Sequence, residues 1–391
     1  MIEKKEKLNL LNKVFSPTAP IKEENFFRGR IDQLKRIVSV MNEDGQHVIL
    51  FGERGVGKTS MANISQKHIT NLFSVKVTCS SEDTFNSLWN NALSQVQFSR
   101  TISGIGFKPQ EKNSLVDLSN VLRAIEDMQP YDVYNCLSQF PMFKFLFIFD
   151  EFDNIKSQHV RSKFADLIKS LSDNSTNIKI MIVGIAENVI NLIGNHQSLE
   201  RCLMQIRMPR MSEPELLEII QKGCDEVEME MTKQVQNKII SFSSGFPHYT
   251  HLLSKFSLKN AIEKDQIKVK TENLDFAINL AIENAAEHLR ESYRMAVFSE
   301  SGNNKWQNVI FACAKCYSDQ FNSFTVEDII QEYQNLVKKE CRIEDIQNEI
   351  EALCDKERGF FLEKQATESN TRFKFANPMM KPFILLNIEA A

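Results

Sequence analysis

The sequence lacks any apolar run long enough to cross a bilayer, and it lacks the apolar core of a signal peptide. Its first residues, MIEKKEK, lead into a mixed amphipathic stretch. Net charge is also nearly absent, because 47 Lys and Arg face 51 Asp and Glu, for a formal charge of −4. The chain as a whole therefore has no strong attraction to nucleic acid or to an anionic membrane. We expect a cytosolic protein without membrane contact, in which any contact with nucleic acid is local.

Clusters of cysteine and histidine with the spacing of a metal site are missing too. The eight cysteines are scattered through predicted strands and helices, which is typical of a reducing compartment. Cys313 and Cys316 form a lone C-x-x-C within a helical pattern, and no second pair lies nearby, so core packing is favoured over a zinc or redox role. His248 and His251 share a helix face without a third ligand, which favours packed or solvent-facing histidines over a metal site.

What the sequence does contain is a complete phosphate loop of the pattern G-x-x-x-x-G-K-T. It consists of Gly52, Glu53, Arg54, Gly55, Val56, Gly57, Lys58 and Thr59, followed by Ser60. The apolar run at 47–51 predicts a strand before it, and residues from Ser60 predict a helix after it, which is the context that this motif requires. Such glycines let backbone N–H groups face a nucleotide's phosphates. We expect Lys58 to bridge the β- and γ-phosphates and Thr59 to ligate Mg²⁺.

An acid pair follows about ninety residues later. The run Phe145–Phe149 is continuously apolar and predicts a parallel strand buried on both faces. It ends in Asp150 and Glu151, at the end of the strand where ligands of such sheets bind. We expect Asp150 to hold Mg²⁺ through water beside Thr59, and Glu151 to act as the general base that polarises the attacking water.

With 391 residues, the chain is long enough for two or three domains. Predicted strands and helices alternate through the first half, which implies an α/β fold with a parallel sheet and helices on both faces. We assign residues 1–25 to an N-terminal arm and 26–211 to a P-loop ATPase core. Within the core, residues 100–114 are predicted to form a loop or a small hairpin.

From Ser212 the pattern is helical, and we assign residues 212–285 to a helical lid. Ser212 and Glu215 form a capping box, Gly245 can end a helix in left-handed geometry, and Pro247 lies in the first turn of the next helix. A longer helix is expected from Thr271 to about Tyr293.

Residues 286–391 predict a winged helix, because three helices precede a hairpin at about 359–375. The alternative is an α+β cap of unrelated topology.

The chain resembles the AAA+ and STAND-type ATPases, and more narrowly the bacterial and archaeal relatives of the origin-recognition initiators. The residues that carry this resemblance, besides the phosphate loop, are Phe27–Arg30, Asp150–Asp153, Ser244–Pro247 and the terminal winged helix. The resemblance covers nearly all of residues 26–391. It implies ATP and Mg²⁺ as cofactors, with Arg28 to Arg30 and the arm Pro17–Pro20 near the adenine. It also implies that Pro247 caps the nucleotide from the lid.

Two further roles are implied by the resemblance. Family members keep a polar sensor after the strand that follows the acid pair, for which Glu187 and Asn188 are displaced candidates. Arg201 lies where relatives keep an arginine finger that reaches a neighbouring subunit, which implies a nucleotide-dependent homo-oligomer. A surface salt bridge is an alternative role for Arg201, and Arg207 or Arg210 are alternative fingers.

We therefore expect a slowly hydrolysing, ATP-dependent molecular switch that changes its affinity for a macromolecular partner. Three classes stay open: an ATPase of the DNA replication or transposition initiator type, a signalling or defence switch that holds an effector protein, and a degenerate binder that keeps ATP for structure.

The predicted winged helix is acidic, which bears on the partner. Residues 286–391 carry 13 Lys and Arg against 17 Asp and Glu, whereas the rest of the chain carries 34 of each. The outward positions of its third helix include Glu344, Asp345, Glu349 and Glu351, and carboxylates there would repel a DNA duplex. We hypothesise that this domain binds a protein or packs on the ATPase core. Any contact with DNA would then come from Arg372 and Lys374 of the hairpin or from the ATPase core.

Overall fold

The computed structural model describes residues 4–390 apart from residues 18–19, 21–28, 70–71, 104–110, 123–124, 175–176, 187–189, 194–198, 200, 300–303, 320 and 367–370. The chain divides into two compact units. One is made of residues 20–209, and the other combines residues 1–19 with residues 210–391. Each is described separately below.

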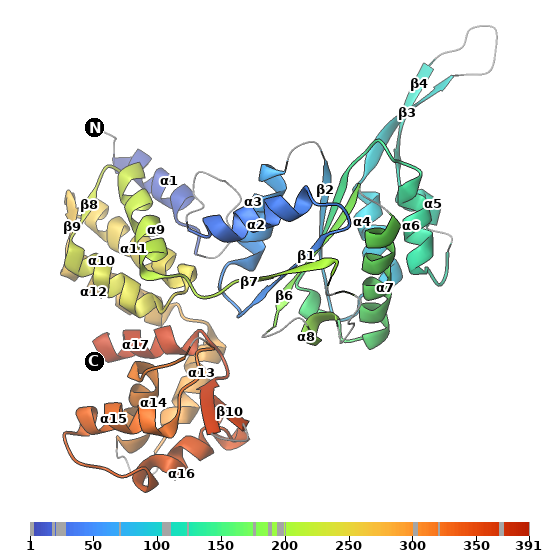
Figure 1. Cartoon of the computed structure of the whole chain (residues 1–391). Coiled ribbons are helices and arrows are strands. Elements are labelled where there is room, and N and C mark those ends of the chain that lie inside the picture. Colours follow the sequence, from blue (N-terminus) through green and yellow to red (C-terminus); the bar gives the residue numbers. More distant parts are fainter. Residues whose placement is uncertain are drawn as a thin grey trace. The chain divides into compact units, whose positions relative to one another are not determined.

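A five-stranded parallel sheet forms the centre of residues 20–209 (Figure 1). In spatial order its strands are β2 (Phe73–Thr78), β5 (Phe145–Asp150), β6 (Ile178–Ile185), β1 (His47–Gly52) and β7 (Leu203–Arg207). Every residue of β1 and β5 is buried, which explains why their sequences are almost continuously apolar. The predicted α/β fold class, with a parallel sheet flanked by helices, is confirmed.

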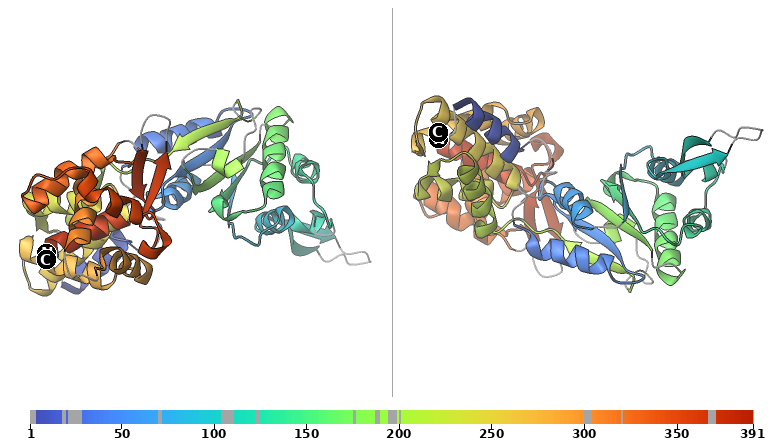
Figure 2. Two further views of the ribbon diagram at one scale, coloured as in Figure 1. Left: turned by 90° about the horizontal axis from the view of Figure 1, so that it is seen from below. Right: turned by 90° about the horizontal axis from the view of Figure 1, so that it is seen from above.

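Helices cover both faces of this sheet (Figure 2). The core of one face is aromatic: the Trp89 ring lies edge-on to the rings of Phe147 and Phe149, with centroids 5.1 and 5.3 Å away. The helical segments are α2 (Ile31–Met41), α3 (Lys58–His68), α4 (Phe85–Ser94), α5 (Ser119–Leu122), α6 (Pro130–Ser138), η2 (Phe152–Asn154), α7 (Gln158–Asn174) and α8 (Ile190–Ile193).

A β-hairpin lies between α4 and α5 in the chain and forms a separate two-stranded sheet. Its strands β3 (Gln97–Ser103) and β4 (Glu111–Asp117) pair antiparallel, and they extend away from the rest of their unit in each view (Figures 1 and 2). The sequence predicted either a loop or a small hairpin for residues 100–114. The structure has a hairpin that begins earlier and ends later, with residues 104–110 outside the described part.

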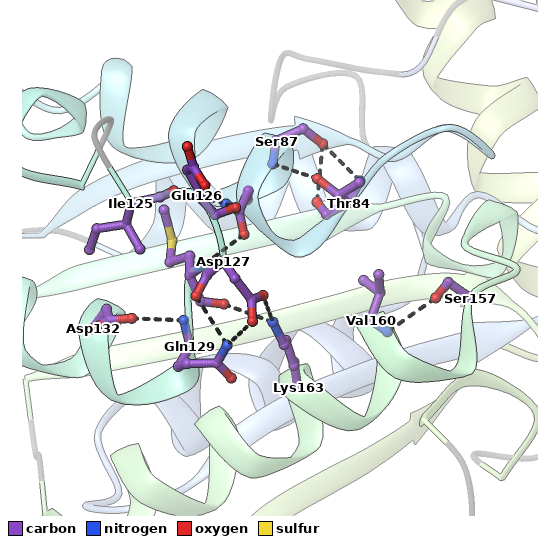
Figure 3. Close-up of polar contacts among 12 residues, drawn as sticks. Thr84, Ser87, Ile125, Glu126, Asp127, Gln129, Asp132, Ser157, Val160 and Lys163 are labelled. Carbon is purple, nitrogen blue, oxygen red and sulfur yellow. Dashed lines mark hydrogen bonds and ion pairs between the residues drawn. The ribbon is translucent and has the colours of Figure 1, made fainter.

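A polar network fixes the chain that enters α6 (Figure 3). The buried Lys163 of α7 donates hydrogen bonds to Asp127 Oδ1, at 2.7 Å, and to the Met128 carbonyl, at 2.9 Å. The next backbone N–H, of Gln129, donates to Asp132 Oδ2 at 2.8 Å and so caps α6. Because its ammonium has two acceptors, Lys163 can be buried between helices without an unpaired charge.

The second unit contains a group of helices that includes the N-terminal one. They are α1 (Lys4–Val14), α9 (Glu213–Glu226), α10 (Lys233–Ser243), α11 (Pro247–Glu263) and α12 (Thr271–Glu283), with the short strands β8 (Glu230–Met231) and β9 (Lys268–Val269). The predicted capping box of Ser212 and Glu215 opens α9. Directly after α1, the buried Phe15 packs so closely on Gly223 that a Cβ there would lie 1.9 Å from its ring. Residues 4–15 are therefore an integral part of this helical packing.

The C-terminal part of the same unit has its own apolar core. Its elements are α13 (Glu287–Val297), α14 (Lys305–Lys315), α15 (Val326–Val337), α16 (Glu344–Ala352), η4 (Lys356–Arg358), β10 (Leu362–Ala366), β11 (Thr371–Phe375) and α17 (Met380–Ala390). The three predicted helices are α14, α15 and α16, and the predicted antiparallel hairpin, β10 and β11, follows them; α13 precedes this set. Cys313 and Cys316 are buried in this core.

One prediction about a helix needs correction, and one helix was missed. The helix expected from Thr271 to Tyr293 is two helices, because α12 ends at Glu283 and α13 begins at Glu287. The Asn284 side chain donates to the Leu280 carbonyl at 2.8 Å and thereby caps the end of α12. Helix α17 was not predicted at all. Within the described residues, no helix is both long enough and apolar enough to cross a membrane.

Candidate functional site

The phosphate loop joins the carboxyl end of β1 to the start of α3. Its glycines take backbone angles that side chains rarely allow, with φ of 151° at Gly52 and 95° at Gly57. A Cβ on Gly52 would lie 2.4 Å from the Met208 carbonyl oxygen, so that only glycine fits there. The loop therefore curls between β1 and the chain leaving β7, and α3 begins directly at Lys58 with its free N–H groups facing the loop.

Lys58 folds back over this loop. It is buried, and its Nζ donates to the carbonyls of Gly52, at 3.0 Å, and Glu53, at 2.7 Å. Burial lowers the pKa of Lys58 to about 8, although Asp153, Asp150 and Glu53 act in the opposite direction. The loop thus holds an ammonium whose positive charge is only partly compensated, at a place where an anion would stabilise it.

Asp150 ends β5, two strands away from β1 in the sheet, and its buried carboxylate faces the start of α3. The Thr59 hydroxyl donates to Asp150 Oδ1 at 3.4 Å, and Lys76 Nζ of β2 lies 3.5 Å from Oδ2. A hydroxyl and a carboxylate side by side are hard oxygen donors, which is the ligand chemistry that Mg²⁺ prefers. The two predicted metal-binding residues are therefore adjacent, and they fit this ion.

Glu151 is exposed, in contrast to Asp150, and its backbone is left-handed with φ of 56°. Its carboxylate is oriented by Asn154, whose Nδ2 donates to Glu151 Oε2 at 3.2 Å and to the Cys79 carbonyl at 3.1 Å. Cys79 follows β2, so Asn154 links the candidate base to the neighbouring strand. We did not predict a role for Asn154 or Lys76. A lysine between two valines of a predicted strand was a usable signal, whereas nothing in the sequence pairs Asn154 with Glu151.

Asp153 connects the acid cluster to the end of β6. Its Oδ1 accepts a hydrogen bond from the Ile185 N–H at 2.7 Å, and it would lie 3.1 Å from a Cβ on Gly184. The carboxyl ends of β5 and β6 are thereby joined directly. The proposed sensor residues beyond this strand, Glu187 and Asn188, lie outside the described residues.

The structure does not add the other predicted site residues to this cluster. Arg28 is outside the described residues, and Pro247 begins α11 in the other unit. Arg201 precedes β7, at the amino edge of the sheet and thus opposite the phosphate loop, because β7 and β1 run parallel. It pairs with Asp173 at 2.8 Å, with 70% of the Arg201 side chain exposed. The structure therefore does not bring Arg201 to the phosphate loop of its own chain.

Arg30 lies beside the loop, although the sequence suggested only a general position near the nucleotide. It is buried, and its Nη2 donates to the carbonyl of Pro209 and, at 3.5 Å, to that of Val56. Val56 belongs to the phosphate loop and Pro209 ends the unit. One guanidinium thus touches both the loop and the segment through which the chain leaves this unit.

Comparison with known proteins agrees with this geometry. A sequence model of the family described as Novel STAND NTPase 1 matches residues 20–296. Cdc6p of Pyrobaculum aerophilum shares the fold with a TM-score of 0.51 and 14% identity, over 97% of this chain and 99% of that one. A Walker-type ATPase of Pyrococcus abyssi gives a TM-score of 0.54 and 14% identity, over 95% and 99%. No curated protein sequence matches.

The resemblance to STAND-type ATPases is confirmed by the family match, and the two archaeal structures show that the chain shares their fold. The family match spans the whole phosphate loop and the acid pair, and it covers more than half of the chain. The chain belongs to the Novel STAND NTPase 1 family of P-loop NTPases.

Proposed function

We propose that this protein is an ATP-binding, Mg²⁺-dependent ATPase that acts as a molecular switch, changing its affinity for a protein partner as ATP is bound and hydrolysed. The observation that carries the proposal is the gathering of Lys58, Thr59, Asp150 and Glu151 at one edge of the sheet. A site that bound a nucleotide only for structural stability would need Lys58 and Thr59, but it would not need the exposed carboxylate of Glu151 in addition to Asp150.

Each side chain of the cluster has a separate task. Lys58 would exchange its two carbonyl acceptors for phosphate oxygens, and its positive charge would then balance part of their negative charge. Mg²⁺, held near Thr59 and Asp150, would neutralise charge on the phosphates. Glu151, oriented by Asn154, would accept a proton from the attacking water.

A switch also needs a link from the phosphate loop to the rest of the chain, and two contacts supply one. Arg30 joins the loop carbonyl of Val56 to that of Pro209. In addition, the Met208 N–H donates to the Phe51 carbonyl at 2.7 Å, directly before the loop. A change in loop conformation on nucleotide binding would therefore be felt at residues 208–209, where the chain leaves the ATPase core.

The charges of the C-terminal part favour a protein partner over DNA. Arg372 of β11 pairs with Asp319 at 3.2 Å, and Lys374 pairs with Glu363 at 3.0 Å, so that both cations suggested for DNA contact are neutralised. On α16, Glu344 is exposed among further acidic and amide side chains. This hairpin and helix α16 therefore offer little unpaired positive charge to the phosphates of DNA.

The experiment is affinity capture with the Glu151→Gln variant loaded with ATP, compared with the same variant loaded with ADP and with Lys58→Ala. We expect one protein to be retained by the ATP-loaded variant and lost from the other two samples. Retention of nuclease-sensitive nucleic acid in place of a protein would instead support an initiator-type function. Equal retention in all three samples would overturn the switch.

The low pKa of Lys58 predicts a pH dependence of nucleotide binding. Phosphates favour the protonated amine, whose pKa in the free protein is about 8. Below that pH the amine is already charged, and affinity for ATP or ADP should be flat. Above it, binding must take up a proton, so affinity should fall by up to about tenfold per pH unit.

Isothermal titration between pH 7 and 9.5 measures this slope. Repeating it at pH 9 in buffers of different ionisation enthalpy detects the proton directly. A constant affinity over the whole range, with no proton uptake, would show that the amine stays charged and that burial does not weaken it.

A further inference from the structure

A second polar pocket lies within the unit that contains residues 210–391, and the family assignment does not account for it. The pocket has a volume of about 570 Å³, which suits a ligand of the size of a sugar phosphate or nucleotide. It opens between the helical part and the C-terminal part of this unit. Its lining residues are Arg210, Met211, Glu213, Leu216, Ile240, Ser241, Phe242, Ser244, Gly245, Ala314, Lys315, Ser318, Asn322, Lys381, Leu385, Ile388 and Glu389.

Three cations face this pocket from different elements: Arg210 before α9, Lys315 at the end of α14, and Lys381 in the first turn of α17. The two acids there are Glu213 and Glu389, and Glu389 already pairs with Lys238 of α10. Positive charge is therefore in excess at the pocket, in a part of the chain that is acidic as a whole.

Lys381 is the decisive residue. It is only partly exposed, and no hydrogen bond or ion pair joins its ammonium to any other residue that the structure describes. Burial lowers the pKa of Lys381, the neighbouring Cys316 acts in the opposite direction, and the positive charge of Arg210, which lines the same pocket, also lowers it. A half-buried cation beside another cation destabilises a fold unless an anion joins them.

We propose that this pocket binds a small ligand through its phosphate group. Lys381, Arg210 and Lys315 would surround the phosphate, and the first turn of α17 would add the favourable end of its dipole. The hydroxyls of Ser241 and Ser318 also line the pocket and could contact the rest of the ligand, and Leu216, Ile240 and Leu385 supply apolar contact.

The position of Arg210 gives such a ligand a regulatory consequence. Arg210 is the first residue after the unit of residues 20–209, and its guanidinium lies 4.5 Å from the centre of the Phe246 ring. The neighbouring Met211 N–H donates to the Gly245 carbonyl at 2.8 Å. A phosphate bound to Arg210 would hold the entry segment against the residues that precede α11.

Calorimetric titration of the full chain tests the proposal. The protein carries Lys58→Ala to weaken binding at the phosphate loop, and ionic strength is held constant. The probes are inorganic pyrophosphate and ribose 5-phosphate, with ribose and malonate as the matched neutral and carboxylate compounds. We expect both phosphates to bind, and Lys381→Met to raise their dissociation constants at least about tenfold. Lys259→Met on α11, which removes an exposed lysine paired with Glu263 outside the pocket, should leave them unchanged.

Thermal unfolding provides a second measurement that does not depend on the first. Because Lys381→Met removes an unpaired half-buried charge, its melting temperature should equal or exceed that of the parent, and pyrophosphate should raise only the parent's. The proposal is overturned if neither phosphate binds, if malonate binds as tightly as pyrophosphate, or if Lys381→Met and Lys259→Met have the same dissociation constants.

Discussion

The Glu151→Gln variant should bind ATP with unchanged affinity and hydrolyse it about a hundredfold to ten-thousandfold more slowly, which is the usual contribution of a positioned general base. The amide keeps the size of the carboxylate, and it can still accept the hydrogen bond from Asn154. It cannot take a proton from water. Single-turnover hydrolysis with preformed enzyme–ATP complex separates this chemical step from binding and release.

Asn154→Ala is the matched control for orientation. It leaves the carboxylate in place but removes the hydrogen bond at 3.2 Å that holds it, so we expect a smaller loss than in Glu151→Gln, and no further loss when the two are combined. If Glu151→Gln hydrolysed ATP at the rate of the native chain, the exposed carboxylate would have no part in catalysis. Asp150 and Asp153 would then need to be tested as the base.

Lys58→Ala should weaken nucleotide binding by about a hundredfold or more. The change removes the buried ammonium that closes the phosphate loop, and one charge-assisted contact to phosphate contributes about 1.5–3 kcal/mol before its effect on loop geometry. Titration with a fluorescent ATP analogue measures the loss. Lys67→Ala, an exposed lysine in the last turn of the same helix α3, should bind as the native chain does.

The two variants should therefore have different defects. Lys58→Ala loses binding, while Glu151→Gln keeps binding and loses turnover. Normal ATP affinity in Lys58→Ala would show that the phosphate loop is not the nucleotide site, whatever the behaviour of Glu151→Gln.

The elements around the phosphate loop could be predicted because their patterns are local. A buried parallel strand is apolar throughout, as in β1 and β5, and the glycines mark backbone angles that other residues avoid. The capping box at Ser212 likewise depends on residues three positions apart. These features need no knowledge of which strands are neighbours.

The contacts that complete the site are long-range, and for that reason the sequence did not reveal them. Lys76 meets Asp150 because β2 and β5 are adjacent in the sheet, and Arg30 meets Pro209 across 179 positions of chain. The break between α12 and α13 was missed because residues 284–286 contain neither glycine nor proline. Helix α17 was missed because its sequence is apolar on more than one face, without the period of a surface helix.

The packing of Phe15 on Gly223 has a practical consequence for dissecting the molecule. The unit of residues 20–209 is one continuous piece of chain, whereas the other unit is assembled from two pieces, residues 1–19 and 210–391. A truncation that starts at Arg210 would leave the surface around Gly223 without its aromatic cover. An isolated companion unit should therefore be expressed with residues 1–19 fused to residue 210 through a short flexible linker. Alternatively, the chain can be permuted so that these two pieces become contiguous.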